Sequence, residues 1–519
     1  MANSTRTNVI TASEETSCQD IFDRMQQRVQ ELRQAFRSQP ITPASTYQFE
    51  KDLKAALDEA GAEILEAELN QVEAAEKQQA APKVRYHKAT YRINKRTKAT
   101  IATSFGNITV WSFYYLNEEN GEPGLHPLHV QLGLESGTTP VLAERVARWA
   151  VDHSQREVRQ LLAAEHGLAW SNDRLRRVLR EFRRLVVMFR VEVQAERVLQ
   201  WLADAERSRG RHRPVLALGR DGIMTPMRDG SPYQEASAGT LSVYDRRKKR
   251  LGTVYLGQMP ESHQVTMTDD LTALVKRVLT DWTGPEPRLV YVTDKGRAQD
   301  DYYRRVLKRM RHPRNPKQCL HWEWVLDFFH AAGYVGKLSE ALFGKSTKDA
   351  QRWFGRMRHW LRDRRQGVTQ VLRSAMQHYN RRKLSKAQEE EFWKAYRYLR
   401  NHSHLMDYAR YRRQGLPIGS GVTEAACKTV FTQRLKRSGM RWGKEFGQVI
   451  VDLRDLPERH LGRSSPPRPA LSPTAAECTK GESKASNAQI VQEGRIIHDA
   501  ESTRPGGNEF GRLHRRAQG

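Results

Sequence analysis

Two apolar runs that each end in an aspartate constrain the fold of this chain more than any other feature. The run PVLALGRDG ends with Asp221 and a glycine, and the run RLVYVTDKG carries Asp294 near its end. Short apolar runs bounded by turn residues predict buried strands, and the segments between them predict a hairpin over about 240–257 and a helix over about 267–282. Strands of a mixed α/β sheet that end in acids can set their carboxylates side by side.

A third acid is expected near residue 424. In LPIGSGVTEAACK, a Gly-Ser-Gly turn precedes an apolar-periodic run and places Glu424 in the first turns of a helix. Glu424 alone could instead complement a helix dipole, and either aspartate alone could be a loop cap. Together, three hard oxygen donors suit two Mg²⁺ or Mn²⁺ ions about 3.5–4 Å apart, an arrangement for phosphodiester displacement. Basic residues that could meet a phosphate backbone follow on the same helix: Arg434, Lys436 and Arg437.

The charge of the chain favours nucleic acid as its partner. The 519 residues include 87 Lys and Arg against 60 Asp and Glu, a net charge of +27. Such a charge attracts polyanions. We expect no membrane partner, because no stretch approaches the roughly 18–20 apolar residues of a span, and the N-terminus lacks the layout of a secretion signal. The four cysteines form no CxxC pair, which is compatible with a reducing cytoplasm: Cys18, Cys319, Cys427 and Cys478.

A helix-turn-helix region is expected before the two acidic strands. Pro140 opens its first helix, and Ser154 and Glu157 form a capping box for the second. Gly167 ends the second helix, and Ser171 or Asn172 caps the third. Three helices with a basic last helix are typical of DNA readers. A basic amphipathic helix is also often only a solvated face, but the basic chain around it favours DNA contact. The arginines expected to bind DNA are Arg174, Arg176, Arg177 and Arg180.

The remaining segments complete an α/β multidomain prediction. Helices over about 20–38 and 47–78, separated by a breaker segment, could form a dimerising arm or a packed hairpin, and we favour the hairpin. The stretch after residue 83 alternates as two or three strands, with turns at Lys95 and Gly106. The predicted regions are a helical N-terminal arm 1–82, a small β-rich module 83–133, the helix-turn-helix region 134–190, core segments 205–333 and 416–460, an all-helical insertion 334–415, and a disordered tail 461–519.

Four motifs resemble the DDE transposases of bacterial insertion sequences, and within them the Kra family of insertion sequences. The motifs are GRDG, VTDKG, LDFFH and GSGVTEAACKTVFTQRLKRSGMRW, and the resemblance covers roughly residues 90–455. It implies a ribonuclease-H-like mixed-sheet core, with Asp221, Asp294 and Glu424 as a triad for two Mg²⁺ (or Mn²⁺) ions. The 130 residues from Asp294 to Glu424 (424 − 294) imply that a helical insertion interrupts the core.

The resemblance also bears on residues around the triad. Asp327 and His330 match an acid-x-x-His element that supports the site or contacts DNA, although both residues could simply share a helix face. The tryptophans of the insertion are more typical of core residues than of base-stacking platforms. Members of the family carry a CxxC-type zinc element before the helix-turn-helix region. No cysteine stands in the matching stretch here, so we expect no zinc.

The expected function is therefore that of a transposase. It would bind the terminal inverted repeats of its element and catalyse metal-dependent cleavage and strand transfer, with double-stranded DNA as element end and target. We expect a homodimer or larger assembly on DNA, in the bacterial cytoplasm and associated with the nucleoid. Two alternatives are a ribonuclease-H-like nuclease or resolvase and a non-catalytic DNA-binding relic. The presence of all three acids makes the relic less favoured, and the inserted helices and basic periphery argue against a simple nuclease.

Overall fold

The computed structural model describes residues 18–73, 77, 80–86, 89–118, 123–134, 136–455 and 472–473. Apart from residues 472 and 473, the predicted disordered tail lies outside the described residues. Among the helices of the described ranges, none combines the length and apolar character needed to cross a membrane.

The N-terminal helices form the expected packed hairpin, with the rings of Phe36 and Phe49 stacked at 4.6 Å between them. The second helix begins earlier than predicted because Pro43 occupies its first turn, where a missing N–H costs nothing. Thr42 caps that turn in a capping box with Ser45, so the segment interpreted as a breaker starts the helix. These helices are α1 (Cys18–Arg37) and α2 (Pro43–Gln71).

A small antiparallel sheet follows, in the order β11-β1-β2-β3. The predicted turn at Lys95 is wrong, because β2 runs through this position and absorbs a register shift between Ile93 and Lys95 as a bulge. The turn before Gly106, which has φ of 111°, joins β2 to β3 as expected. The elements are β1 (Lys83–Tyr86), β2 (Ala89–Thr103), β3 (Gly106–Asn117), α3 (Pro127–Leu132) and β11 (Ser472–Pro473).

Three helices occupy the predicted helix-turn-helix region, and the predicted caps are confirmed. Ser154 and Glu157 form the capping box, Gly167 is left-handed at the end of the second helix, and Ser171 caps the third. The third helix does not end near residue 190, because buried apolar residues continue at helical spacing to Leu202. The helices are α4 (Pro140–Asp152), α5 (Gln155–His166) and α6 (Asn172–Arg207).

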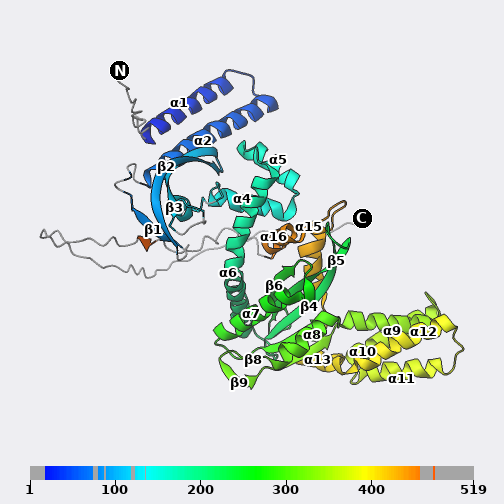
Figure 1. Cartoon of the computed structure of the whole chain (residues 1–519). Helices are drawn as coiled ribbons and strands as arrows, with labels where there is room; N and C mark the ends of the chain where they lie inside the picture. Colours follow the sequence, from blue (N-terminus) through cyan, green and yellow to red (C-terminus); the bar gives the residue numbers. More distant parts are fainter. Residues whose placement is uncertain are drawn as a thin grey trace, which may run out of the picture. The chain divides into compact units, whose positions relative to one another are not determined.

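A five-stranded mixed sheet in the order β10-β7-β4-β5-β6 forms the centre of the core (Figure 1). Strands β4, β5 and β6 are antiparallel neighbours, whereas β7 and β10 run parallel to β4. This arrangement confirms the predicted mixed α/β class. The elements are β4 (Val215–Pro226), β5 (Tyr233–Tyr244), β6 (Arg250–Gln258), η2 (Ser262–Gln264), α7 (Val265–Asp281), β7 (Arg288–Thr293), α8 (Arg297–Arg305), η3 (Leu307–Arg309), β8 (Arg311–His312), β9 (Asn315–Cys319) and β10 (Trp322–Leu326).

The segment between β10 and Glu424 is helical, as predicted for the insertion. Trp353 is buried, and Trp360 and Trp393 are partly buried against the same apolar core, so the interpretation of these tryptophans as core residues is confirmed. The helices are α9 (Phe328–Phe343), α10 (Lys348–Asp363), α11 (Gly367–Tyr379), α12 (Lys386–Asn401), η4 (Ser403–Leu405) and α13 (Tyr408–Gln414), and the last part of the core holds α14 (Gly421–Ala426), the π-helix η5 (Cys427–Thr432), α15 (Gln433–Leu435) and α16 (Lys444–Arg454).

Candidate active site

The strand register brings Asp221 and Asp294 together. The parallel pairing of β4 with β7 ends with Gly219 opposite Val292. Two residues further along the chain stand Asp221, still within β4, and Asp294, the first residue after β7 (221 − 219 = 294 − 292 = 2). Side chains two residues apart lie on the same face of a sheet. The two carboxylates are therefore neighbours on one face, although β4 does not end at Asp221 as predicted but continues along β5 to Pro226.

Helix α14 covers the face that carries Asp221. Gly219 lies opposite Thr240 on β5, and the hydroxyl oxygens of Thr240 and Thr423 are 3.0 Å apart. A Cβ on Gly219 would collide with the Thr423 side chain, so only glycine lets the helix approach the sheet this closely. Thr423 immediately precedes Glu424, and the charge of Glu424 acts on Asp221, so α14 brings the third predicted acid near the first.

Asp221 is held by two hydrogen-bond donors in a partly buried position. The Gly222 N–H donates to its Oδ1 at 2.7 Å, and the Cys427 thiol donates to its Oδ2 at 3.7 Å. Burial raises the pKa of Asp221, and the charges of Asp294 and Glu424 raise it further, against the lowering effect of the two donors. The three acids are therefore close enough for their charges to interact, and bringing them together has an electrostatic cost.

Asp327 supports the turn that presents Glu424. Its carboxylate is buried, accepts from the His330 N–H at 2.5 Å as the cap of α9, and also accepts from the Ser420 N–H. The Ser420 hydroxyl in turn donates to Glu424 Oε1 at 3.1 Å. Of the two roles predicted for Asp327, the contacts fit support of the site and leave none of its surface for DNA. His330 is exposed.

Aromatic side chains of the insertion lie beside the strand end that carries Asp294. The Tyr398 hydroxyl donates to the backbone oxygen of Asp294 at 3.2 Å, and the ring of Tyr398 stacks on Tyr334 at 3.7 Å. His330 lies within 5.8 Å of the Tyr398 ring centroid. The sequence offered no periodic signal for this contact, because α12 and β7 meet only through the tertiary fold. The sequence also offered no signal for the contact between Cys427 and Asp221, because these residues are likewise brought together only by the tertiary fold.

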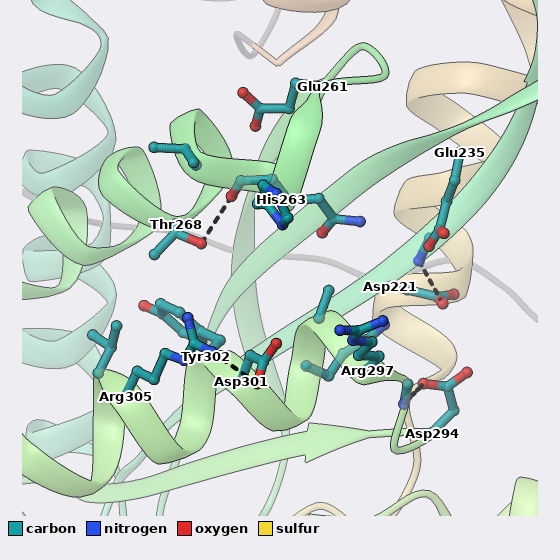
Figure 2. A pocket seen from close by; sticks show the side chains of 17 residues that line it. Asp221, Glu235, Glu261, His263, Thr268, Asp294, Arg297, Asp301, Tyr302 and Arg305 are labelled. Carbon is teal, nitrogen blue, oxygen red and sulfur yellow. Dashed lines mark hydrogen bonds and ion pairs between the residues drawn. The ribbon is translucent and has the colours of Figure 1, made fainter.

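A pocket of about 830 Å³ opens beside Asp221 and Asp294 (Figure 2). Its other walls come from β5, from the bend before α7 and from α8, and Glu424 does not line it. Buried Arg220 holds the bend by donating to the backbone and side-chain oxygens of Gln264. His263 and Gln264 both have positive φ, at 55° and 50°, which is uncommon outside glycine. Charged side chains at the pocket wall include Glu235, Glu261, Arg297, Asp301 and Arg305.

The residues predicted to bind DNA divide into buried and exposed groups. Arg434 is 2% exposed and donates to the backbone oxygens of Ala150 and His153, at 3.3 and 2.7 Å. Burial lowers its pKa to about 10. Its guanidinium joins the core to the end of α4, so the prediction that Arg434 contacts DNA is wrong. Lys436 and Arg437 are exposed as predicted.

The arginines of α6 differ in how much of them is accessible. Arg174 donates to the Gly137 backbone oxygen and lies 4.9 Å from the Trp170 ring, which fixes its side chain. Arg176 donates to Gln155, and Arg180 pairs with Glu445 at 2.9 Å. Arg177 is exposed. Arg177 and Arg180 are therefore the members of the predicted set best placed to meet a phosphate backbone.

The donor chemistry of the triad suits a divalent metal ion. Carboxylate oxygens are the ligands that Mg²⁺ and Mn²⁺ prefer, and a bound cation would offset the burial and the neighbouring negative charges that raise the pKa of Asp221. Glu424 is exposed and Asp221 and Asp294 are partly so, which leaves their oxygens accessible. In the described ranges, no three His, Cys, Asp or Glu side chains converge closely enough to form a complete ligand set.

No protein-family model matches the chain, and no curated protein matches it. The function of the chain is therefore inferred from the chemistry of the site itself.

Proposed function

We propose that the chain is a DNA transposase of the DDE type, with Asp221, Asp294 and Glu424 as its catalytic carboxylates. One observation carries the proposal: neighbouring parallel strands end their pairing two residues before Asp221 and Asp294, on the face covered by the helix of Glu424. Burial raises the pKa of Asp221, and the charges of Asp294 and Glu424, which come from two distant segments, raise it further. Such perturbed clusters are typical of functional sites.

The proposal includes a ribonuclease-H-like fold for the core. The strand order β6-β5-β4-β7-β10, three antiparallel strands followed by two parallel ones, is compatible with it. The helices between β10 and α14 would be the insertion that the resemblance implies. Exposed basic residues on α6 and after α15 support double-stranded DNA as the partner, and a homodimer or larger assembly would hold two element ends. The proposed location is the bacterial cytoplasm, at the nucleoid.

Each residue has a separate task in this proposal. Asp221, Asp294 and Glu424 would hold two Mg²⁺ or Mn²⁺ ions, which when bound activate an attacking oxygen and stabilise the leaving one. Asp327, through Ser420, orients the Glu424 carboxylate. Tyr398 fixes the backbone at Asp294. The Cys427 thiol orients Oδ2 of Asp221.

The test is cleavage of labelled element-end DNA by the full-length protein with Mg²⁺, beside a chelator control. Glu424→Gln and Asp294→Asn should each lower nicking and end joining by at least about 10³-fold while DNA affinity changes little, because the charge that holds the metal is lost. Glu390→Gln, which alters an exposed carboxylate on α12, is the matched control and should retain activity.

The other outcomes decide between the alternatives. Full cleavage by Asp294→Asn would overturn the assignment of the triad. Metal-dependent cleavage of branched DNA without end joining would identify a nuclease or resolvase. Tight binding to element ends with no cleavage in any metal would identify a DNA-binding relic.

A further inference from the structure

A second pocket lies apart from the triad. Its volume is about 600 Å³, within the range of small-ligand sites, and its walls come from α4, α6, β6, η5 and α16. It contains none of Asp221, Asp294 and Glu424, and the proposed function assigns it no role.

The walls of this pocket are aromatic and fixed in place. Trp149, Trp201 and Tyr255 line it. Trp201 lies directly over Gly252, where a Cβ would collide with the indole, so the strand surface is flat at this point. The Gln194 amide donates to the Tyr255 backbone oxygen at 2.9 Å. Flat rings held by their surroundings favour a planar ligand that stacks on them.

The rim of the pocket carries more cations than acids. Arg148 and Arg197 line it together with one exposed acid, Asp152. Arg197 lies 5.5 Å from the Trp201 ring centroid, so a cation and an aromatic face stand together at one wall. This combination favours a ligand that joins an anionic group to a planar ring.

Asp455 provides a polar group with unused hydrogen-bonding capacity. The residue is 3% exposed, and its Oδ2 accepts from the Gly257 N–H at 2.6 Å. Its Oδ1 is buried without a hydrogen-bond partner, although Asp455 lines the pocket. An unsatisfied buried oxygen costs free energy that a ligand group could recover.

Contacts of the Arg454 side chain hold the walls of the pocket together. Arg454 is almost fully buried, donates to the Thr429 backbone oxygen at 3.0 Å and to the Val151 backbone oxygen, and pairs with Asp152 at 3.0 Å. One side chain thus ties α16 to the π-helix and to the end of α4, so the walls keep their spacing.

We propose that this pocket binds a nucleotide, with its base stacked on Trp149 or Trp201, its phosphate at the arginine rim and a polar edge of the base at Asp455. The pocket has an aromatic surface for a planar ring, arginines for an anion and a carboxylate for a polar group. A nucleotide contains a ring, an anion and a polar edge. The ligand could be a free nucleotide or an unpaired nucleotide of bound DNA, and the two sources share this chemistry.

The test is calorimetric titration of the full-length protein, in chelator, with each of the four deoxynucleoside monophosphates. A second arm uses a duplex with one unpaired nucleotide beside the fully paired duplex. Saturable binding of one monophosphate per chain would support the site with a free nucleotide as ligand. Preference for the unpaired duplex without such binding would support a DNA nucleotide. No binding of monophosphates and no preference for the unpaired duplex would overturn the proposal.

Matched variants test whether the nucleotide binds in this pocket. Trp201→Leu should weaken it by about tenfold or more, because base stacking on tryptophan is lost. Trp360→Leu is the control, since Trp360 is also partly buried and lies 4.2 Å from an arginine, Arg364, but is outside the pocket. Equal loss in both variants would overturn the assignment. Arg197→Gln provides a second probe that keeps the indole, and it should lower affinity for monophosphates more than for nucleosides.

Asp455→Asn tests the recognition of the base. It should change the order of preference among the four monophosphates, whereas Trp201→Leu should weaken all four alike, because stacking tolerates any base and hydrogen bonding does not. Binding in the Asp294→Asn protein should be unchanged. A failure of the proposed transposase activity would therefore leave this result interpretable.

Discussion

Opposing interactions act on the pKa of Asp221. Burial and the charges of Asp294 and Glu424 raise its pKa, while the Gly222 N–H and the Cys427 thiol lower it. Because the folded-state pKa is raised, the protonated carboxyl contributes stability at low pH, and this contribution is lost as the pH rises through that pKa. The metal-free site is therefore destabilised where it carries its full charge, and a cation reverses the effect.

A pH prediction follows from the Cys427 contact. Metal binding requires ionised Asp221, so cleavage should fall on the acid side at a higher pH than an ordinary aspartate would set. Cys427→Ala removes a donor that lowers the pKa, so the acid limb should move to still higher pH. On that limb the variant should cleave about two- to tenfold more slowly, as expected for one hydrogen bond.

The measurement is the pH dependence of cleavage at saturating Mg²⁺. Cys319→Ala is the control, because Cys319 is exposed on β9. Coincident profiles for Cys427→Ala and Cys319→Ala would show that the thiol has no influence on Asp221.

At the scale of elements, close approach of α14 to the sheet brings Glu424 to the aspartates. Gly219→Ala places a methyl group against the Thr423 side chain and should push α14 outward. We expect a loss of about 1–3 kcal/mol in stability and at least about a tenfold loss of cleavage. Gly333→Ala, in helix α9 with no atom near the added carbon, should be neutral or stabilise by up to about 1 kcal/mol.

Thermal unfolding and cleavage assays on these two glycine variants would check the prediction. Unchanged cleavage by Gly219→Ala would mean that the spacing between sheet and helix does not set the position of Glu424.

Elements with a strong local signal were predictable from the sequence, and contacts between distant elements were not. The caps at Ser154, Gly167 and Ser171 involve residues close together in the chain, so the local sequence predicts them. The turn at Lys95 was mispredicted because a bulge and a turn have the same polar composition, and only pairing with β3 distinguishes them. The length of α6 was underestimated because its apolar stripe continues without a break past residue 190.

The same limit explains the outcome for the candidate site. The places of Asp221, Asp294 and Glu424 in the fold were predictable because each stands next to a strand or turn signal, and their role as a catalytic triad stays a prediction. The burial of Arg434 was not, because its partners are backbone oxygens of Ala150 and His153, over 280 residues away in the chain. Basic residues after an active-site helix look alike in sequence whether they face solvent or the core.

Across the described residues, buried charges tie α6, the last helix of the predicted helix-turn-helix region, to the core. Arg190 of α6, 5% exposed, pairs with Asp452 of α16 at 2.8 Å and with Asp270 of α7. Arg183 also pairs with Asp452, at 2.5 Å, and Gln448 donates to it at 2.9 Å. A buried charge left without its partner is costly, so this network specifies how α6 sits on the core. Helix α6 therefore carries basic residues at one end and forms part of the core at the other.

With a net charge of +27, the chain should bind DNA with an affinity that falls as salt rises. Exposed Arg177 on α6 should contact a phosphate, so Arg177→Gln should weaken binding to all DNA sequences alike and reduce the salt slope of affinity by about 1. Arg207→Gln is the control, because Arg207 is 76% exposed on the same helix but at its core end, and it should leave the slope unchanged. Arg434→Met should lower the melting temperature instead, since it removes donors to two backbone oxygens. Binding isotherms over about 50–200 mM salt measure the slopes. Equal slopes for Arg177→Gln and Arg207→Gln would place the DNA elsewhere, whereas a reduced slope with an unchanged melting temperature for Arg434→Met would restore Arg434 to the DNA-binding surface.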